Sequence, residues 1–224
     1  ARAVASLAAE GVRVIGENAL DARIAGSILV IRSHGASPDL MERAKALGAE
    51  VLDATCPRVV ASQRRAADFS ARGWSVVIAG DRGHGEVTAV AARAPGAHIV
   101  ANAAEAEALE LVPPVGLISQ TTIKKEEYDA IVEVLSRRYS VVEAADSICP
   151  ATAERQGALR ELLSRVDAVV VGATRPEQVT EKLLEYVPRT DAGGPVLPLS
   201  FGGMPAEAGQ ASFGLVAAGR LVLE

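Results

Sequence analysis

Short apolar runs alternate with helix-like stretches along nearly the whole chain, and this alternation limits the possible folds more than any other feature. The apolar runs are rich in Val and Ile and are bounded by Gly, Pro or polar residues, as strands are. Between them, apolar residues recur at the spacing of one helix face. Strands that alternate with helices are joined by right-handed crossovers into parallel sheets. The sequence therefore predicts an α/β fold of repeated small units with mostly parallel sheets.

The predicted elements cover most of the chain. Strands are expected over 12–15, 28–32, 50–53, 75–79, 98–100, 115–119, 141–143, 168–171 and 196–199. Helices are expected over 39–47, 59–71, 86–93, 124–138, 151–165 and 176–186. Only 3% of the residues are aromatic, so Ala, Val, Leu and Ile must form the core, which suits sheets covered by helices.

An internal repeat divides the chain. Cys56-Pro57 begins one predicted helix, and Cys149-Pro150 begins another 93 positions later. The apolar run 76–80 has a counterpart at the same separation, in 169–173. Equal spacing of two kinds of element indicates duplicated units, with the cysteines at equivalent places. We therefore expect the remainder of a first, incomplete unit over 1–55, a second unit over 56–147 and a third over 148–224.

Charge and cysteine content argue against several classes of protein. The net charge of −5 disfavours electrostatic binding to nucleic acid or to an anionic membrane. No apolar run approaches the roughly 20 residues that span a bilayer. Two cysteines are too few for a disulfide scaffold, so the reducing cytoplasm is the expected compartment.

Chemically capable side chains follow the predicted strands, where the next helix begins. Functional groups of parallel α/β folds gather at the carboxyl ends of strands. The candidates are His34, Cys56, His84, Glu86, Thr121 and Cys149. Together they offer thiols, imidazoles, a carboxylate and a hydroxyl to a common site.

The two cysteines are candidate metal ligands. A thiolate at a helix N-terminus is stabilised by the helix dipole, and the Pro that follows presets the first helical turn. A single cysteine in such a place is more often a small buried apolar residue, but the duplication favours a shared function. Zinc and iron–sulfur clusters both accept thiolates, so the pattern leaves the metal open. A homodimer that pools two thiolates per chain is an alternative.

His34 and His84 form a candidate anion site, because each adjoins a glycine that lets backbone amides approach a ligand. The alternative for both is helix or loop capping. Glu86 fits a first-turn carboxylate or, if it reaches a closed pocket, a group that delivers protons. Thr121 is either a helix cap or a member of the same site.

These motifs, in this order, resemble the 4-hydroxy-3-methylbut-2-enyl diphosphate reductase family, the LytB type. The resemblance covers residues 28 to about 172. The matching segments are Ser33-His34-Gly35-Ala36-Ser37-Pro38, Asp53-Ala54-Thr55-Cys56-Pro57, Gly83-His84-Gly85-Glu86-Val87, Ser119-Gln120-Thr121-Thr122 and Ile148-Cys149-Pro150-Ala151-Thr152-Ala153-Glu154-Arg155-Gln156.

The resemblance implies three α/β domains around a pseudo-threefold axis and a central 4Fe–4S cluster. It implies that Cys56 and Cys149 ligate the cluster and that His34 and His84 bind the substrate diphosphate. Glu86 would serve the proton relay, and Thr121 would lie near the substrate hydroxyl. The implied reaction is the reductive loss of that hydroxyl in the methylerythritol phosphate route to isoprenoids, which yields isopentenyl and dimethylallyl diphosphates. A ferredoxin or flavodoxin-type protein would donate the electrons.

The chain departs from the family pattern in three places, one of which is a late Ser loop that residues 200–205 match only loosely. The family's first cysteine segment has no counterpart in this sequence, so the third cysteine ligand of the cluster is expected to be absent. Where the family has a Ser-Ser-Asn loop, this chain has Thr174 and Arg175, which are the candidates there for binding diphosphate. Two interpretations follow: a reductase of this family, truncated or inactive as it stands, or a non-catalytic or divergent α/β paralogue that binds a metal or a phosphorylated ligand.

Overall fold

The computed structural model describes residues 7–16, 19–163 and 165. One compact unit comprises Ile15–Ala153, and a second holds Ala1–Val14 and Glu154–Glu224. The elements in chain order are η2 (Ala22–Ile24), β1 (Ile28–Ile31), α2 (Pro38–Ala46), β2 (Glu50–Asp53), α3 (Pro57–Ala71), β3 (Ser75–Ala79), α4 (Gly85–Ala91), β4 (His98–Val100), α5 (Ala103–Glu107), β5 (Val115–Ser119), α6 (Lys125–Arg138), β6 (Val142–Ala145) and α7 (Pro150–Leu163). The α/β class and the parallel sheets are confirmed, and the three predicted unit boundaries stay a prediction.

The first sheet pairs β1 with β2 in parallel, and helix α2 covers one of its faces. Ile31 packs there with Leu40 and Ala44 of the helix. The helix begins where the sequence predicts, because the Ser37 hydroxyl accepts the Leu40 N–H at 3.2 Å and Pro38 follows. On the other face three large apolar side chains are more than half exposed, namely Ile28, Val30 and Leu52.

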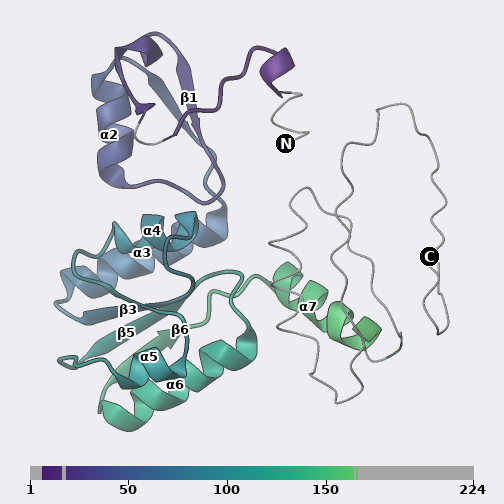
Figure 1. Ribbon diagram of the computed structural model, residues 1–224. Coiled ribbons are helices and arrows are strands. Elements are labelled where there is room, and N and C mark those ends of the chain that lie inside the picture. Colours follow the sequence, from purple (N-terminus) through teal and green to yellow (C-terminus); the bar gives the residue numbers. More distant parts are fainter. Residues whose placement is uncertain (1–6, 17–18, 164, 166–224) are drawn as a thin grey trace. The chain divides into compact units, whose positions relative to one another are not determined.

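The second sheet has four parallel strands in the order β4-β3-β5-β6. Alternate residues of β3 face opposite layers, as the pleat requires. Val77 packs in the cluster that includes α5 and α6, whereas Val76 and Ile78 pack with α3 and α4. Figure 1 shows the helices of each pair on their own side of the sheet. Two apolar layers therefore hold the sheet rigidly and fix the loops at its edge.

The strand order creates a switch point between β3 and β5. After β3 the chain moves outward to β4, and it then returns past β3 to form β5 on the other side. The connections that leave β3 and β5 therefore diverge to opposite faces, α4 to one and α6 to the other. Ligand sites of open α/β sheets lie at such points, beyond the carboxyl ends of the strands.

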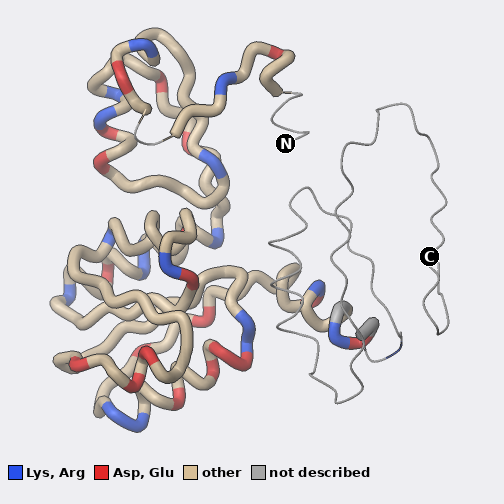
Figure 2. Tube along the Cα trace, viewed as in Figure 1, with Lys and Arg blue, Asp and Glu red and all other residues tan. Residues whose placement is uncertain are grey.

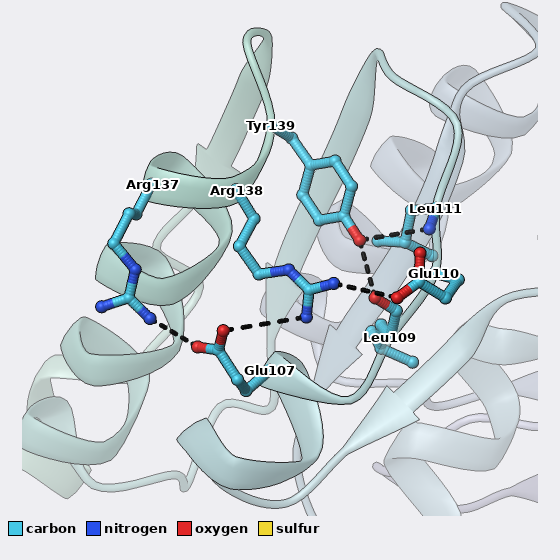
Figure 3. A network of polar contacts seen from close by, with 7 residues as sticks. All are labelled: Glu107, Leu109, Glu110, Leu111, Arg137, Arg138 and Tyr139. Atoms are coloured by element: carbon cyan, nitrogen blue, oxygen red, sulfur yellow. Dashed lines mark hydrogen bonds and ion pairs between the residues drawn. The ribbon is translucent and has the colours of Figure 1, made fainter.

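Polar contacts fasten α6 to the segment around α5 (Figure 3). The Tyr139 hydroxyl donates to the Leu109 carbonyl at 2.8 Å and accepts the Leu111 N–H at 3.1 Å. Arg137 and Arg138 form ion pairs across the same boundary, with Glu107 and, for Arg138, also with Glu110. Positive and negative residues are interspersed along the described elements (Figure 2), and no described helix is long and apolar enough to cross a membrane.

One predicted strand is wrong in the described part of the chain, and one α-helix there was not predicted. Residues 12–15 are not a strand: the Val12 N–H bonds back to the Leu7 carbonyl at 2.9 Å, Val12 and Val14 are exposed, and the segment pairs with no described strand. The short helix α5 was not predicted, because five residues are too few to show a helical period. The predicted strands 168–171 and 196–199 and the predicted helix 176–186 lie outside the described residues.

Candidate functional site

The loop after β3 places His84 and Glu86 at the start of α4. His84 is the N-cap of this helix, and its Nδ1 accepts the Glu86 N–H at 3.3 Å. His84 therefore caps the helix, as the alternative interpretation expects, but capping uses only one of its two ring nitrogens. A neutral imidazole whose Nδ1 accepts a hydrogen bond carries its proton on Nε2. His84 thus keeps one N–H donor for a ligand.

Glu86 and Thr121 meet at the switch point. The Thr121 N–H and the Thr121 hydroxyl donate to the two carboxylate oxygens of Glu86, each at 2.7 Å. Glu86 is 2% exposed and Thr121 is 8% exposed, so the pair lies away from bulk water. A buried carboxylate that shares a hydrogen bond with a hydroxyl can exchange a proton through it.

Gln120 holds the loop after β3 against the loop after β5. Its side-chain oxygen accepts the Asp81 N–H at 2.8 Å, and its side-chain nitrogen donates to the Thr122 hydroxyl at 2.6 Å. Gly80 permits this close approach, because an added Cβ there would lie 2.5 Å from the Gln120 oxygen. Gln120 therefore fixes the spacing of the two loops that carry Glu86 and Thr121.

His34 approaches His84 from the other sheet. The ring centroids lie 5.0 Å apart with an interplanar angle of 61°, an edge-to-face contact. The next residue, Gly35, has a φ of +78°, a conformation that side-chain-bearing residues rarely adopt. His34 Nδ1 is buried and has no hydrogen-bond partner among the described residues. An unsatisfied buried nitrogen of this kind is costly unless a ligand pairs with it.

The electrostatic surroundings of His34 favour its neutral form. Burial lowers the pKa of His34 below its ordinary value, and the charges of His84 and Arg32 lower it further. Glu86 opposes the shift. A positive charge on His34 is therefore disfavoured in this place, and a bound anion would oppose that effect.

Both cysteines stand at helix starts, as the repeat predicts. Cys56 is the N-cap of α3, and its N–H donates to the Ser33 carbonyl at 3.0 Å. Cys149 directly precedes α7, and its N–H donates to the Thr121 carbonyl at 2.9 Å. Both thiols are free and half-buried, so neither is a sealed core residue.

The thiolate form of Cys149 is favoured by its position. The N–H groups of Thr152 and Ala151 lower the pKa of the Cys149 thiol, and the Arg58 guanidinium adds to the effect. Arg58 lies two residues beyond Cys56, so the start of α3 is within electrostatic range of Cys149. The start of α3 therefore contributes to the electrostatic surroundings of Cys149.

Contacts connect most of the predicted site residues. His34 meets His84, Glu86 bonds Thr121, and the Thr121 backbone bonds Cys149. Thr174 and Arg175 lie outside the described residues. The sequence analysis missed three residues of this region: Arg32, Arg58 and Gln120. The first two had a signal that was not used, since each is a cation two positions from a singled-out histidine or cysteine.

Comparisons with known proteins point in one direction. The model of the LytB protein family matches residues 1–193. A 4-hydroxy-3-methylbut-2-enyl diphosphate reductase from Treponema pallidum (strain Nichols) is 41% identical over 184 residues, which covers 72% of this chain and 49% of the relative. The corresponding reductase from Treponema denticola is 41% identical over 166 residues, with 71% and 57% covered.

A solved structure agrees with these relatives. An E-1-hydroxy-2-methyl-but-2-enyl-4-diphosphate reductase from Plasmodium falciparum superposes with a TM-score of 0.66 at 29% sequence identity. The superposition covers 73% of this chain and 53% of that protein. The chain thus spans about half the length of the relatives it matches.

Proposed function

Because the chain belongs to the LytB protein family, we propose that it contributes to the reductive dehydroxylation of 4-hydroxy-3-methylbut-2-enyl diphosphate. The overall change consumes two electrons and two protons, releases the hydroxyl as water and yields isopentenyl or dimethylallyl diphosphate. The buried Glu86–Thr121 pair carries this proposal, because the departing hydroxyl needs a proton inside a site that excludes bulk water.

His34 and His84 are proposed to bind the diphosphate. The Nε2 of His84, whose Nδ1 caps the helix, and the unpaired Nδ1 of His34 are the groups available for this role. Protonation of His34 on anion binding would make that nitrogen a donor as well. Thr174 and Arg175 are proposed as further diphosphate ligands from their place in the sequence alone.

Glu86 and Thr121 are proposed to supply the proton. Because the Thr121 hydroxyl is hydrogen-bonded to the carboxylate, it can pass a proton from a protonated Glu86 to a leaving hydroxyl. The second hydrogen bond, from the Thr121 N–H, holds the carboxylate in one orientation. This fixed geometry removes most of the reorganisation that proton transfer would otherwise need.

Cys56 and Cys149 are proposed as two ligands of a 4Fe–4S cluster. Both are free thiols at helix N-termini, and the amide N–H groups around Cys149 favour the thiolate that iron requires, so both fit the group. The described residues contain no group of three His, Cys, Asp or Glu side chains placed to hold a metal, so the third ligand is not found among them. When bound, the cluster supplies electrons and a Lewis-acidic iron.

The partners follow from this chemistry. A small iron–sulfur or flavin protein of the ferredoxin or flavodoxin type is proposed as the electron donor. A compartment that keeps thiols reduced, such as the cytoplasm, suits free cysteine ligands. Two chains that pool their four thiolates remain a proposed alternative for completing the metal site.

The test measures turnover by the Glu86→Gln variant of the anaerobically purified, full-length protein, supplied with a reduced low-potential electron donor. Gln has the shape of Glu but cannot release a proton, so turnover should fall by about 10²–10⁴-fold while iron and sulfide content stay unchanged. Glu133→Gln, at an exposed position on α6, is the matched control and should leave turnover unchanged.

Two outcomes would contradict the proposal. Turnover by Glu86→Gln equal to that of Glu133→Gln would remove the carboxylate from the reaction. Protein that contains zinc or no metal, and that turns over nothing yet binds a phosphorylated ligand, would instead favour the non-catalytic paralogue.

A further inference from the structure

Arg32 lies where the two histidines meet, although the sequence motifs do not include it. It follows β1 and precedes Ser33-His34. Its guanidinium reaches over the first residue of α4: a Cβ built on Gly85 would lie 2.5 Å from Nη2 of Arg32 and 3.5 Å from Cβ of His34. The guanidinium therefore occupies the space that a side chain at position 85 would fill.

None of the acidic groups in the described part of the chain bonds to this cation. Arg32 makes no side-chain hydrogen bond or ion pair with any described residue. The carboxylate beside His34 and His84 is Glu86, and both of its oxygens are already engaged by Thr121. Arg32, His34 and His84 thus converge as hydrogen-bonding groups, and none of the three forms an ion pair with a described carboxylate.

We propose that Arg32 is a third anion-binding residue of this site and that it binds the more solvent-exposed phosphoryl group of a diphosphate. The inference rests on the proposed function and assigns a residue to it. Arg32 is exposed whereas the two histidines are half-buried, so the guanidinium lies at the outer side of the histidine pair. The planar fork of an arginine pairs two N–H donors with two phosphoryl oxygens, which a histidine cannot do.

Gly85 is part of the same arrangement. Its φ is not in the left-handed region, so nothing in the backbone demands glycine there. The guanidinium of Arg32 would have to shift to make room for even an alanine side chain. Replacement by alanine therefore displaces Arg32 while keeping its charge and improving the helix propensity of α4.

Binding of inorganic pyrophosphate and of inorganic phosphate to the full-length protein, measured by calorimetry, tests the proposal. Arg32→Gln should weaken pyrophosphate binding by about tenfold or more, because charge-assisted hydrogen bonds are among the strong ones. Gly85→Ala should weaken it severalfold. Arg43→Gln removes the same charge from an exposed position on α2 and should leave binding within about twofold of the unmodified protein, since exposed charges are screened.

Discrimination between the two anions adds a second readout. The unmodified protein should prefer pyrophosphate to phosphate, and Arg32→Gln should narrow that preference, because the second phosphoryl group loses its partner. The pyrophosphate preference of Arg32→Lys should lie between those of the unmodified protein and of Arg32→Gln, since lysine keeps the positive charge but lacks the paired N–H donors of the guanidinium. Thermal unfolding of each variant verifies that the chain is folded.

The outcomes separate this proposal from the reductase proposal. Equal pyrophosphate affinities of Arg32→Gln and Arg43→Gln, or no pyrophosphate binding by the unmodified protein, would overturn the role of Arg32. Neither result concerns metal content. Conversely, a protein without iron and sulfide that still loses pyrophosphate binding on Arg32→Gln would support Arg32 and count against the reductase.

Discussion

Replacement of Thr121→Val tests the hydrogen bond at the centre of the proposed site. Valine keeps the branched shape and the backbone N–H, so the bond from that N–H to Glu86 survives and only the hydroxyl is lost. One oxygen of a carboxylate that is 2% exposed is then left without its partner. A hydrogen bond to a charged group contributes about 1.5–3 kcal/mol, so the free energy of unfolding should fall by about 2 kcal/mol.

Urea denaturation measures this loss. With a slope of about 2 kcal/mol per molar urea, the midpoint should drop by about 1 M. Thr121→Ser is the control: it keeps the hydroxyl and loses one buried methyl group, at a cost of about 0.8 kcal/mol. If Thr121→Val were as stable as Thr121→Ser, the hydroxyl would not be bonded to Glu86 in solution, and the proposed proton path would fail with it.

Three further predictions concern titration and packing. Burial and nearby cations lower the pKa of His34 in the folded chain, so as the pH falls the unfolded chain binds a proton at this histidine before the folded chain does. The free energy of unfolding should therefore decrease below about pH 6.5. In His34→Gln, the midpoint of urea denaturation should depend less on pH in this range. In protein without a cluster, the rate of Cys149 alkylation, followed by mass spectrometry, should rise at a lower pH than for an ordinary thiol. Arg58→Gln should move this rise to higher pH. Gly116→Ala would place a Cβ 2.3 Å from the buried Phe69 ring. The free energy of unfolding, measured by calorimetry, should therefore fall by about 1–3 kcal/mol or more.

Local signals in the sequence correctly placed the elements that carry the site. Both Cys-Pro pairs begin helices, because Pro at the first helical position fits whatever the tertiary surroundings are. The apolar runs of β3 and β5 are buried at nearly every position, so their composition alone identified them. The position of His34, Glu86 and Thr121 after strands also follows from the sequence, since parallel strands end at one edge.

Segments without a strong local signal were predicted less well. Residues 12–15 have the composition of a strand, but a strand exists only where a neighbour completes its hydrogen bonds, and no described segment does so. Helix α5 is too short for its period to be seen. For residues 12–15 the local sequence lacks the information because a strand depends on a partner elsewhere in the chain, whereas for α5 the segment is too short to carry a pattern.

The amino-acid sequence by itself determined the α/β class, the strand ends that bear reactive groups and the family resemblance. Only the tertiary structure decided which of these groups meet. The crossover that places β3 beside β5 joins Glu86 to Thr121 across 35 residues, and the approach of the first sheet to α4 puts Arg32 over Gly85. Such contacts depend on strand order and on side-chain packing between distant segments, and neither is written in the local pattern of residues.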